Sequence, residues 1–238
     1  MAHKTDDLLV IDTGNLARRW VTYIVGIYIL TFGVSLAIRA GIGISPLSSL
    51  TRTMTLVYPP LSQGTYNFIT ELVMLAATYF VLPKDFGLKS FASLLPALAL
   101  AVFLDFNLVI TEFVKLDLYF AKLALLVFAD AALAFGLFLM IRANLVLMPM
   151  DMFVNTLCKR TGWKWGNIKT FYDCALLVLS AAIGLAFLAD IPFIREGTII
   201  NALLVGQYIR LYFFLYKRFF ANKQDQEPRV QTLGHAVE

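Results

Sequence analysis

Charged side chains interrupt the apolar runs of this chain, and their chemistry is the first clue to what it does. Seven of those within or at the ends of these runs are candidates for a functional role: Arg39, Glu71, Asp105, Asp130, Arg142, Asp173 and Arg210. A charge in hydrocarbon costs at least ~2.5–3.5 kcal/mol on insertion scales, so such side chains usually face a partner or a water-filled pathway. Buried acids of this kind carry protons or cations in many transporters.

Asp130 is the strongest single candidate because it lies midway along the apolar run 118–141. This position leaves the side chain no easy route to the membrane surface, so we expect a functional ionisable group there. The alternative is a neutral carboxyl group that is hydrogen-bonded to a neighbouring helix.

The other charges have structural alternatives. Arg39 and Arg142 end their runs, where a long side chain can reach the lipid headgroups, and Arg210 could do the same. Pairs such as Glu71 with Arg39 could be ion pairs that only fix helix packing, and so could Asp173 with Arg142.

Composition places these residues in a membrane protein. The chain has 238 residues, of which 59% are hydrophobic and 15% are charged, and its mean hydropathy is +0.74. A soluble domain of this size cannot hide so much apolar surface. Six continuous runs can each cross roughly 30 Å of hydrocarbon as a helix, and continuous runs favour helices over a barrel. The six runs are residues 20–38, 65–82, 90–111, 118–141, 168–189 and 197–216.

One motif occurs twice at a constant offset. Residues 32–46 and 135–149 share Phe, Gly, Leu, Arg, Ala and Pro at equivalent positions, each at the end of an apolar run. We therefore expect two related membrane repeats, 20–112 and 118–217. Each repeat holds three runs, and an odd number of spans inverts the second repeat relative to the first. The predicted fold is an all-α membrane protein with six transmembrane helices in two inverted three-helix repeats.

The repeat also pairs the charged residues. Gly64 aligns with Gly166, which puts Glu71 opposite Asp173. The third span of each repeat then contributes one more charge, although that part of the alignment rests on weaker local identity. The alignment predicts an outer cluster of Arg39, Glu71 and Asp105 and an inner cluster of Arg142, Asp173 and Arg210.

A short helix is expected after the first span of each repeat. Ser45 is a good N-cap and Pro46 suits the first helical position. Pro149 repeats this start, and Asp151 follows at the third helical position. Two arrangements remain open. A re-entrant half-helix would point exposed amides at an anionic substrate group, whereas an amphipathic helix would lie on the membrane surface.

Lysine and arginine are distributed unequally between the two sides. With the N-terminus in the cytoplasm, thirteen fall inside and four outside, which favours both termini inside. All three tryptophans then lie at the inner interface. We expect a multi-pass protein of the bacterial inner membrane, with a cytoplasmic tail at 1–19 and a disordered cytoplasmic tail at 221–238.

The chain lacks the residues that most enzymes and cofactor-binding proteins need. Its two histidines, His3 and His235, lie in the tails, and no metalloprotease, nucleophile-elbow or P-loop motif is present. Cys158 and Cys174 have no metal-binding or disulfide spacing. We therefore predict no enzyme activity, no metal and no cofactor. The basic residues lie between the apolar runs, so we also expect no nucleic-acid partner.

The motif at 39–46 begins with an arginine, continues through glycines and ends in Ser-Pro, and Gly64 precedes the next span. In these residues, and in 201–206, the chain resembles the YitT/YczE/YyaS-like family of bacterial integral membrane proteins. Three positions differ from the family's common pattern, since Leu-Ser at 47–48 replaces Trp-Asp and Arg210 replaces an acidic residue. The resemblance implies a membrane fold and brings no reaction with it.

These features favour a secondary transporter or permease for a small solute, which would be anionic if half-helix amides bind it. Because no P-loop is present, an ion gradient or another subunit would drive transport. The alternative function is a non-transporting membrane partner or sensor that modulates another protein. The expected partners are the lipid bilayer and a small molecule or ion, and a homo-oligomer stays open.

Overall fold

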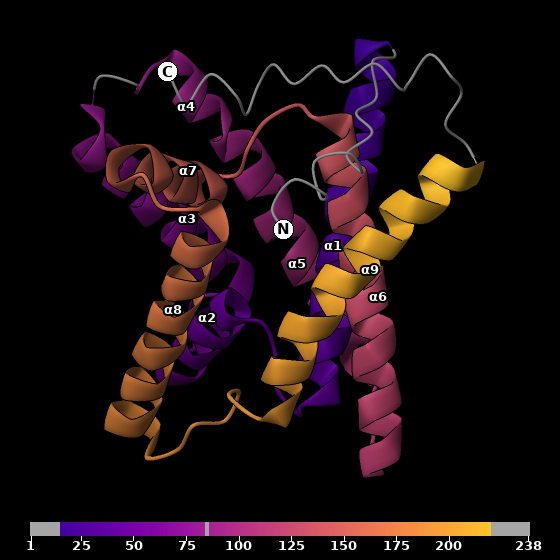
Figure 1. The fold of residues 1–238 in the computed structure, drawn as a ribbon. Helices are drawn as coiled ribbons and strands as arrows, with labels where there is room; N and C mark the ends of the chain where they lie inside the picture. The colour runs from indigo at the N-terminus through magenta and orange to yellow at the C-terminus, as the bar shows by residue number, and fades with distance from the viewer. Residues whose placement is uncertain (1–14, 84–85, 220–238) are drawn as a thin grey trace.

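The computed structural model describes residues 15–83 and 86–219, and most of them are helical. The long helices are α1 (Leu16–Ala40), α3 (Gln63–Val81), α5 (Leu94–Ile110), α6 (Tyr119–Ala143), α8 (Trp165–Leu188) and α9 (Glu196–Phe219). The short ones are α2 (Pro46–Val57), α4 (Leu88–Ala92), the 3₁₀ helix η4 (Thr111–Phe113) and α7 (Pro149–Thr161). The described residues contain no strand, which confirms the predicted all-helical class (Figure 1).

Five helical segments of the described chain are long and apolar enough to cross a membrane. They are α1, α6, α8, α9 and the segment Ser90–Phe113, which contains α5. The sixth predicted span corresponds to α3, which is less apolar because its first half carries Gln63, Asn67 and Glu71. All three side chains are buried, so α3 keeps its polar groups inside the protein. The structure thus agrees with a multi-pass helical membrane protein.

Helix α1 begins earlier than the sequence predicts. The side chain of Asn15 accepts a hydrogen bond from the amide of Ala17 (3.4 Å), and Gly41 ends the helix with a φ of +68°. The last residues of the stretch 1–19, which we expect to be a cytoplasmic tail, are therefore the first turn of this helix.

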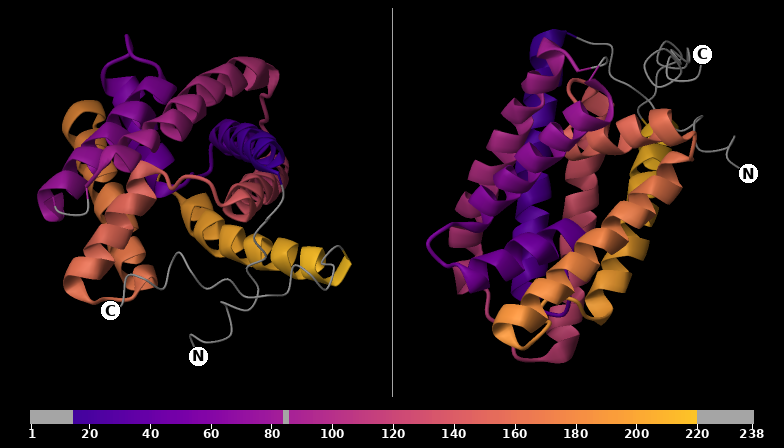
Figure 2. Two further views of the ribbon diagram at one scale, coloured as in Figure 1. Left: turned by 90° about the horizontal axis from the view of Figure 1, so that it is seen from above. Right: turned by 90° about the vertical axis from the view of Figure 1, so that its left-hand side faces the viewer.

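The helices form two groups that one packed pair joins (Figures 1 and 2). In the first group, α5, α1, α6 and α9 pack side by side in that order. In the second group, α2, α8, α7 and α3 form a ring in which each helix packs on the next. Packing of α3 on α5 links the groups, whereas α8 and α9 share no such packed face and lie apart in Figure 1.

Helices α1 and α6 run antiparallel and approach each other at backbone distance. A Cβ on Gly33 would overlap the backbone of Leu133, and a Cβ on Gly136 would overlap the backbone of Leu30. Glycine permits this approach at both points, as small residues do in many membrane helix pairs. The motif that occurs twice in the sequence thus builds one interface from both of its copies.

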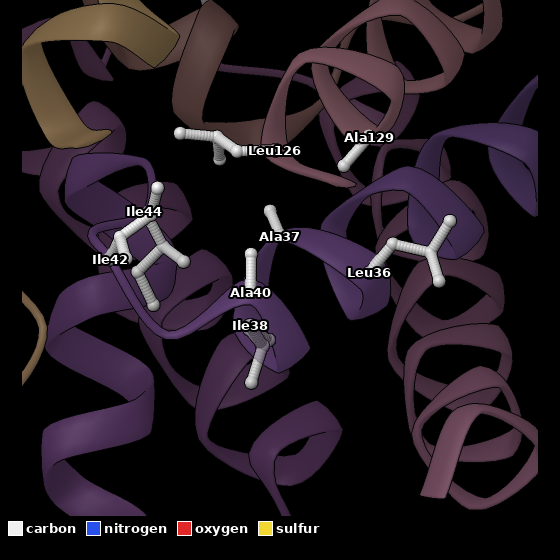
Figure 3. Packing of buried hydrophobic residues seen from close by; sticks show 8 residues of the cluster. All are labelled: Leu36, Ala37, Ile38, Ala40, Ile42, Ile44, Leu126 and Ala129. Carbon is white, nitrogen blue, oxygen red and sulfur yellow. The ribbon is translucent and has the colours of Figure 1, made fainter. Parts of the chain in front are cut away.

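The segment after α1 is buried although it is not helical. Ile42 and Ile44 are each 2% exposed, and they pack with Leu126 and Ala129 of α6 (Figure 3). The carbonyl of Ile42 accepts a hydrogen bond from the amide of Gly197 at the start of α9 (2.8 Å). Irregular backbone inside a membrane protein is tolerated when protein covers it in this way.

Gly33→Ala and Gly136→Ala should each lower the melting temperature of the detergent-solubilised protein, because the added methyl group overlaps backbone. We expect a loss of about 1–3 kcal/mol for each, the usual range for overpacking. Gly206→Ala in α9 is the matched control, because nothing lies near a Cβ there and alanine should gain up to ~1 kcal/mol of helix propensity. Size-exclusion chromatography after heating measures all three. Equal melting temperatures would contradict the close contact between α1 and α6.

Candidate functional site

The two short helices begin as predicted, and one face of each packs on the long helices. Pro46 and Pro149 occupy the first positions of α2 and α7. Both helices pack against α3 and α8, and Leu50 of α2 and Val154 of α7 share one buried apolar cluster with Tyr172 of α8. Both helices therefore cover their apolar faces with protein.

A carboxylate from α3 meets the start of α7. Glu71 is 2% exposed, and its Oε2 accepts a hydrogen bond from the backbone amide of Met150 (2.9 Å). Asp151 lies in the first turn of the same helix, as predicted. The partial positive charge at a helix N-terminus stabilises a nearby anion, and here the protein supplies that anion itself. The amide of Met150 is therefore already occupied by a side chain.

The start of α2 has no such carboxylate. Ser45 precedes the helix as predicted, but its hydroxyl donates to Ser48 Oγ (2.9 Å), and the first turn contains no acidic residue. The hydroxyl oxygens of Ser49 and Thr53 lie 3.0 and 3.1 Å from Ser180 Oγ of α8. Hydroxyl groups therefore line α2, whereas α7 meets a carboxylate.

Asp130 is fully buried in α6, as the sequence indicates. Its Oδ1 accepts a hydrogen bond from Asn201 Nδ2 of α9 (2.6 Å), and its Oδ2 has no hydrogen-bond partner in the described chain. No group of three or more His, Cys, Asp or Glu residues among the described ones could hold a metal ion. A lone buried carboxylate suits a proton or a monovalent cation instead.

The predicted outer cluster of Arg39, Glu71 and Asp105 does not form, because backbone groups hold each charge separately. Arg39 Nη2 donates to the carbonyl of Leu108 near the end of α5 (2.6 Å). Asp105 Oδ1 accepts a hydrogen bond from the amide of Gly64 at the start of α3 (2.7 Å). Helix ends thus replace the ion pairs that the sequence suggested.

The three charges of the predicted inner cluster are also apart. Arg142 Nη2 donates to Tyr216 Oη, and its guanidinium carbon lies 3.9 Å from the centroid of that ring. Asp173 pairs with Lys169 one turn earlier in α8, and 31% of its side chain is exposed. Arg210 is exposed on α9. Asp173 therefore does not share the burial of its aligned partner in α3.

The sequence analysis did not predict two residues of the candidate site, Arg52 and Asn201. Counting charges by loop puts Arg52 on the outer surface, yet it is half-buried in α2 and close enough to Arg39 for the two charges to repel each other. Asn201 reads as part of the last apolar run, yet it is 4% exposed and binds Asp130. A polar side chain within an apolar or half-helix segment was the signal in both cases.

Comparison with known proteins identifies the family. A family model described as "Family of unknown function (DUF6198)" matches residues 17–213. The chain belongs to this family. It is also 27% identical over 200 residues to the uncharacterized membrane protein YczE of Bacillus subtilis (strain 168), a match that covers 82% of this chain and 85% of the relative. The resemblance to a YczE-like family is thus confirmed, and no solved structure matches the chain.

Glu71→Ala should destabilise the protein by about 1–3 kcal/mol, because it leaves the partly buried amide of Met150 without an acceptor. Glu71→Gln should cost less, since it keeps an acceptor and loses only the favourable charge at the helix start. Asp173→Ala is the matched control, because a partly exposed pair with Lys169 contributes little. Melting temperatures in detergent measure the series. Equal losses for Glu71→Ala and Asp173→Ala would contradict the capping role.

Proposed function

We propose that the chain is a secondary transporter for a small solute, built from two inverted repeats of three spans with α3 as the sixth span. The observation that carries the proposal is that the two halves pack in the same way except at one pair of helices. Repeats that adopt different arrangements about one central site are the basis of alternating access in many transporters.

Equivalent hydrogen bonds in the two halves support the inverted repeat. Asn107 of α5 donates to the carbonyl of Tyr28 in α1 (3.4 Å), and Tyr212 of α9 donates to the carbonyl of Ala131 in α6 (3.0 Å). Tyr28 and Ala131 are equivalent at the offset of the duplicated motif. The alignment of the third spans makes Asn107 and Tyr212 equivalent as well. This agreement supports the part of the alignment that rested on weak identity.

The packing of the helices is also equivalent in the two halves. Packing of α1 on α5 corresponds to that of α6 on α9, α3 on α7 to α8 on α2, and α2 on α3 to α7 on α8. The exception is α3 on α5, because its counterpart, α8 on α9, is not packed. A two-fold axis that relates the halves would pass between α1 and α6.

Glycines mark the unpacked pair. In the first half, Gly64 packs on Ala101 so closely that a Cβ would overlap the carbonyl oxygen. The equivalent residues, Gly166 and Gly206, both have open space where a Cβ would point. A helical glycine costs roughly 1 kcal/mol relative to alanine, so two without a packing role are unexpected. In the proposed cycle they meet in a second state, in which α8 packs on α9 as α3 packs on α5.

The proposed cycle therefore has two states, one in which α3 packs on α5 and one in which α8 packs on α9. In the described state, Asp105 holds the start of α3 on α5, and α8 is not packed on α9. Closing α8 on α9 while α3 leaves α5 would expose the short helices to the opposite side. With both termini in the cytoplasm, as the charge bias favours, the described state faces inward across a bacterial inner membrane. The proposal involves no enzymatic step and no cofactor.

Cross-linking between paired cysteines tests the exchange of states. Ser62 and Asp105 are in hydrogen-bond contact, and their equivalents are Lys164 and Arg210. In a chain without native cysteines, Ser62→Cys/Asp105→Cys should cross-link in the described state, and Lys164→Cys/Arg210→Cys should do so only in the other. Across ionic conditions in native membranes, a higher yield of one pair should accompany a lower yield of the other. A 164–210 pair that never cross-links would contradict the proposal.

Gly166→Leu provides the control for that experiment. The open space at Gly166 should accept leucine with no loss of melting temperature, whereas leucine should block the approach of α9 and abolish the 164–210 cross-link. A variant that keeps both its stability and the cross-link would show that these glycines do not meet.

Asp130 is the proposed ion-coupling group, because its Oδ2 is buried without a partner in the described chain. Asp130→Asn keeps the shape and removes the charge. In proteoliposomes, the cross-link yield of the Lys164→Cys/Arg210→Cys chain should respond to an imposed proton or sodium gradient, and that of the same chain with Asp130→Asn should not. The same chain with Asp190→Asn, at an exposed position after α8, should respond like the chain without it. If the cross-link yield still responds to the gradient in the chain with Asp130→Asn, the role of Asp130 is structural only.

A further inference from the structure

Two arginines at one end of the bundle have no acidic partner. Arg39 lies at the end of α1 and Arg52 lies in α2, and the two positive charges are close enough to act on each other. Neither arginine forms an ion pair with a carboxylate of the described chain. Two like charges that are both partly buried repel each other, so an additional interaction is needed to balance them.

The guanidinium groups are also short of hydrogen-bond acceptors. The Nε atoms of Arg39 and Arg52 are both buried and have no acceptor among the described residues. Arg39 reaches one backbone carbonyl, that of Leu108, through Nη2 (2.6 Å). A buried charged donor that lacks an acceptor is costly, and an anion between the two side chains would supply acceptors and negative charge together.

Asp105, the acidic residue of α5 near Leu108, already has other hydrogen-bond partners. Asp105 lies one turn before Leu108, but its Oδ1 accepts from the amide of Gly64 (2.7 Å) and its Oδ2 accepts from the hydroxyl of Ser62. Asp105 therefore holds α3 on α5 and does not neutralise the arginines. Among the described residues, no carboxylate forms an ion pair with Arg52.

Serine hydroxyls share a face of α2 with Arg52. Ser45, Ser48 and Arg52 follow one another at helical spacing, and Ser48 is 8% exposed. The first turn of α2 contains no acidic residue, and the partial charge of a helix N-terminus favours an anion. Guanidinium, hydroxyl and helix-start donors together match the acceptor oxygens of a carboxylate or a phosphate.

We propose that a small oxyanion binds between Arg39 and Arg52, beside the first turn of α2, and that it belongs to the class of solute carried. Only the second clause rests on the proposed transport function. The start of α7 cannot serve as an equivalent site while Glu71 occupies the amide of Met150. The starts of the two short helices therefore have different roles. The start of α7 binds a carboxylate of the protein, and the start of α2 binds an oxyanion from solution.

Titration of the purified full chain in detergent, at constant ionic strength in a chloride buffer, tests the site. The separate probes are inorganic phosphate, acetate and phosphatidylglycerol in mixed micelles, because a lipid headgroup carries the same oxyanion chemistry as free phosphate. A saturable rise in melting temperature with phosphate or acetate supports a solute site. A response to phosphatidylglycerol alone would overturn the solute assignment, and no response to any probe would overturn the site.

Arg52→Gln gives the sharper readout, because the site predicts opposite effects with and without anion. Without added anion the variant should melt at a higher temperature than the unaltered chain, since one of two repelling charges is gone. The apparent affinity for the effective anion should fall at least tenfold. Arg39→Gln should also weaken binding, with lower stability because it loses its bond to Leu108.

Arg195→Gln is the control, because this arginine is exposed and lies beside Glu196 at the start of α9. It should bind the anion like the unaltered chain. Unchanged affinity in Arg52→Gln, or an equal loss in Arg195→Gln, would overturn the site. These binding measurements do not depend on transport. A failure to bind would contradict the anion site without affecting the cross-linking result. A failure to cross-link would contradict the proposed transport cycle without affecting the binding result.

Discussion

The backbone contact between α1 and α6 is the constraint on which the rest of the structure depends. Gly33 and Gly136 let the two helices approach until each glycine meets the backbone of the other helix. Each of these helices carries one further long helix at its side, α5 or α9, and leads directly to one short helix. One central interface therefore sets the positions of four long helices and of the starts of α2 and α7.

Helix ends, not ion pairs, hold several of the buried charges. Glu71 and Asp105 accept hydrogen bonds at the starts of α7 and α3, and Arg39 donates near the end of α5. Each sign matches the partial charge of the helix end that it meets. Such a contact satisfies a buried charge and fixes a helix terminus at once. It also explains why α3 is central, since α3 gives a carboxylate to one helix and receives one from another.

The sequence was sufficient for the helical class, for both proline helix starts and for the burial of Glu71 and Asp130, because periodicity, capping and the cost of charge in lipid act locally. It could not predict which charges meet. Alignment made Glu71 and Asp173 equivalent, yet of the two only Glu71 reaches the start of a short helix. That contact depends on the tilt of α3 and α8 relative to α7 and α2, which no local pattern encodes. The interaction of Arg52 with Arg39 could not be predicted for the same reason, since it depends on how α2 packs.

The difference between the two halves has an electrostatic origin within the proposed repeat. Asp105 places a carboxylate at the start of α3, where the helix dipole favours it, and so stabilises the closed pair of α3 and α5. The equivalent Arg210 would bring a cation to the start of α8, where the dipole opposes it and where Lys164 already adds positive charge, whereas Lys169 is paired with Asp173. Closure of α8 on α9 therefore gains packing at two glycines but opposes two like charges and a helix end. The arrangement without that contact is the one these charges favour, and the proposed transport cycle would have to supply negative charge or free energy before Arg210 can reach α8.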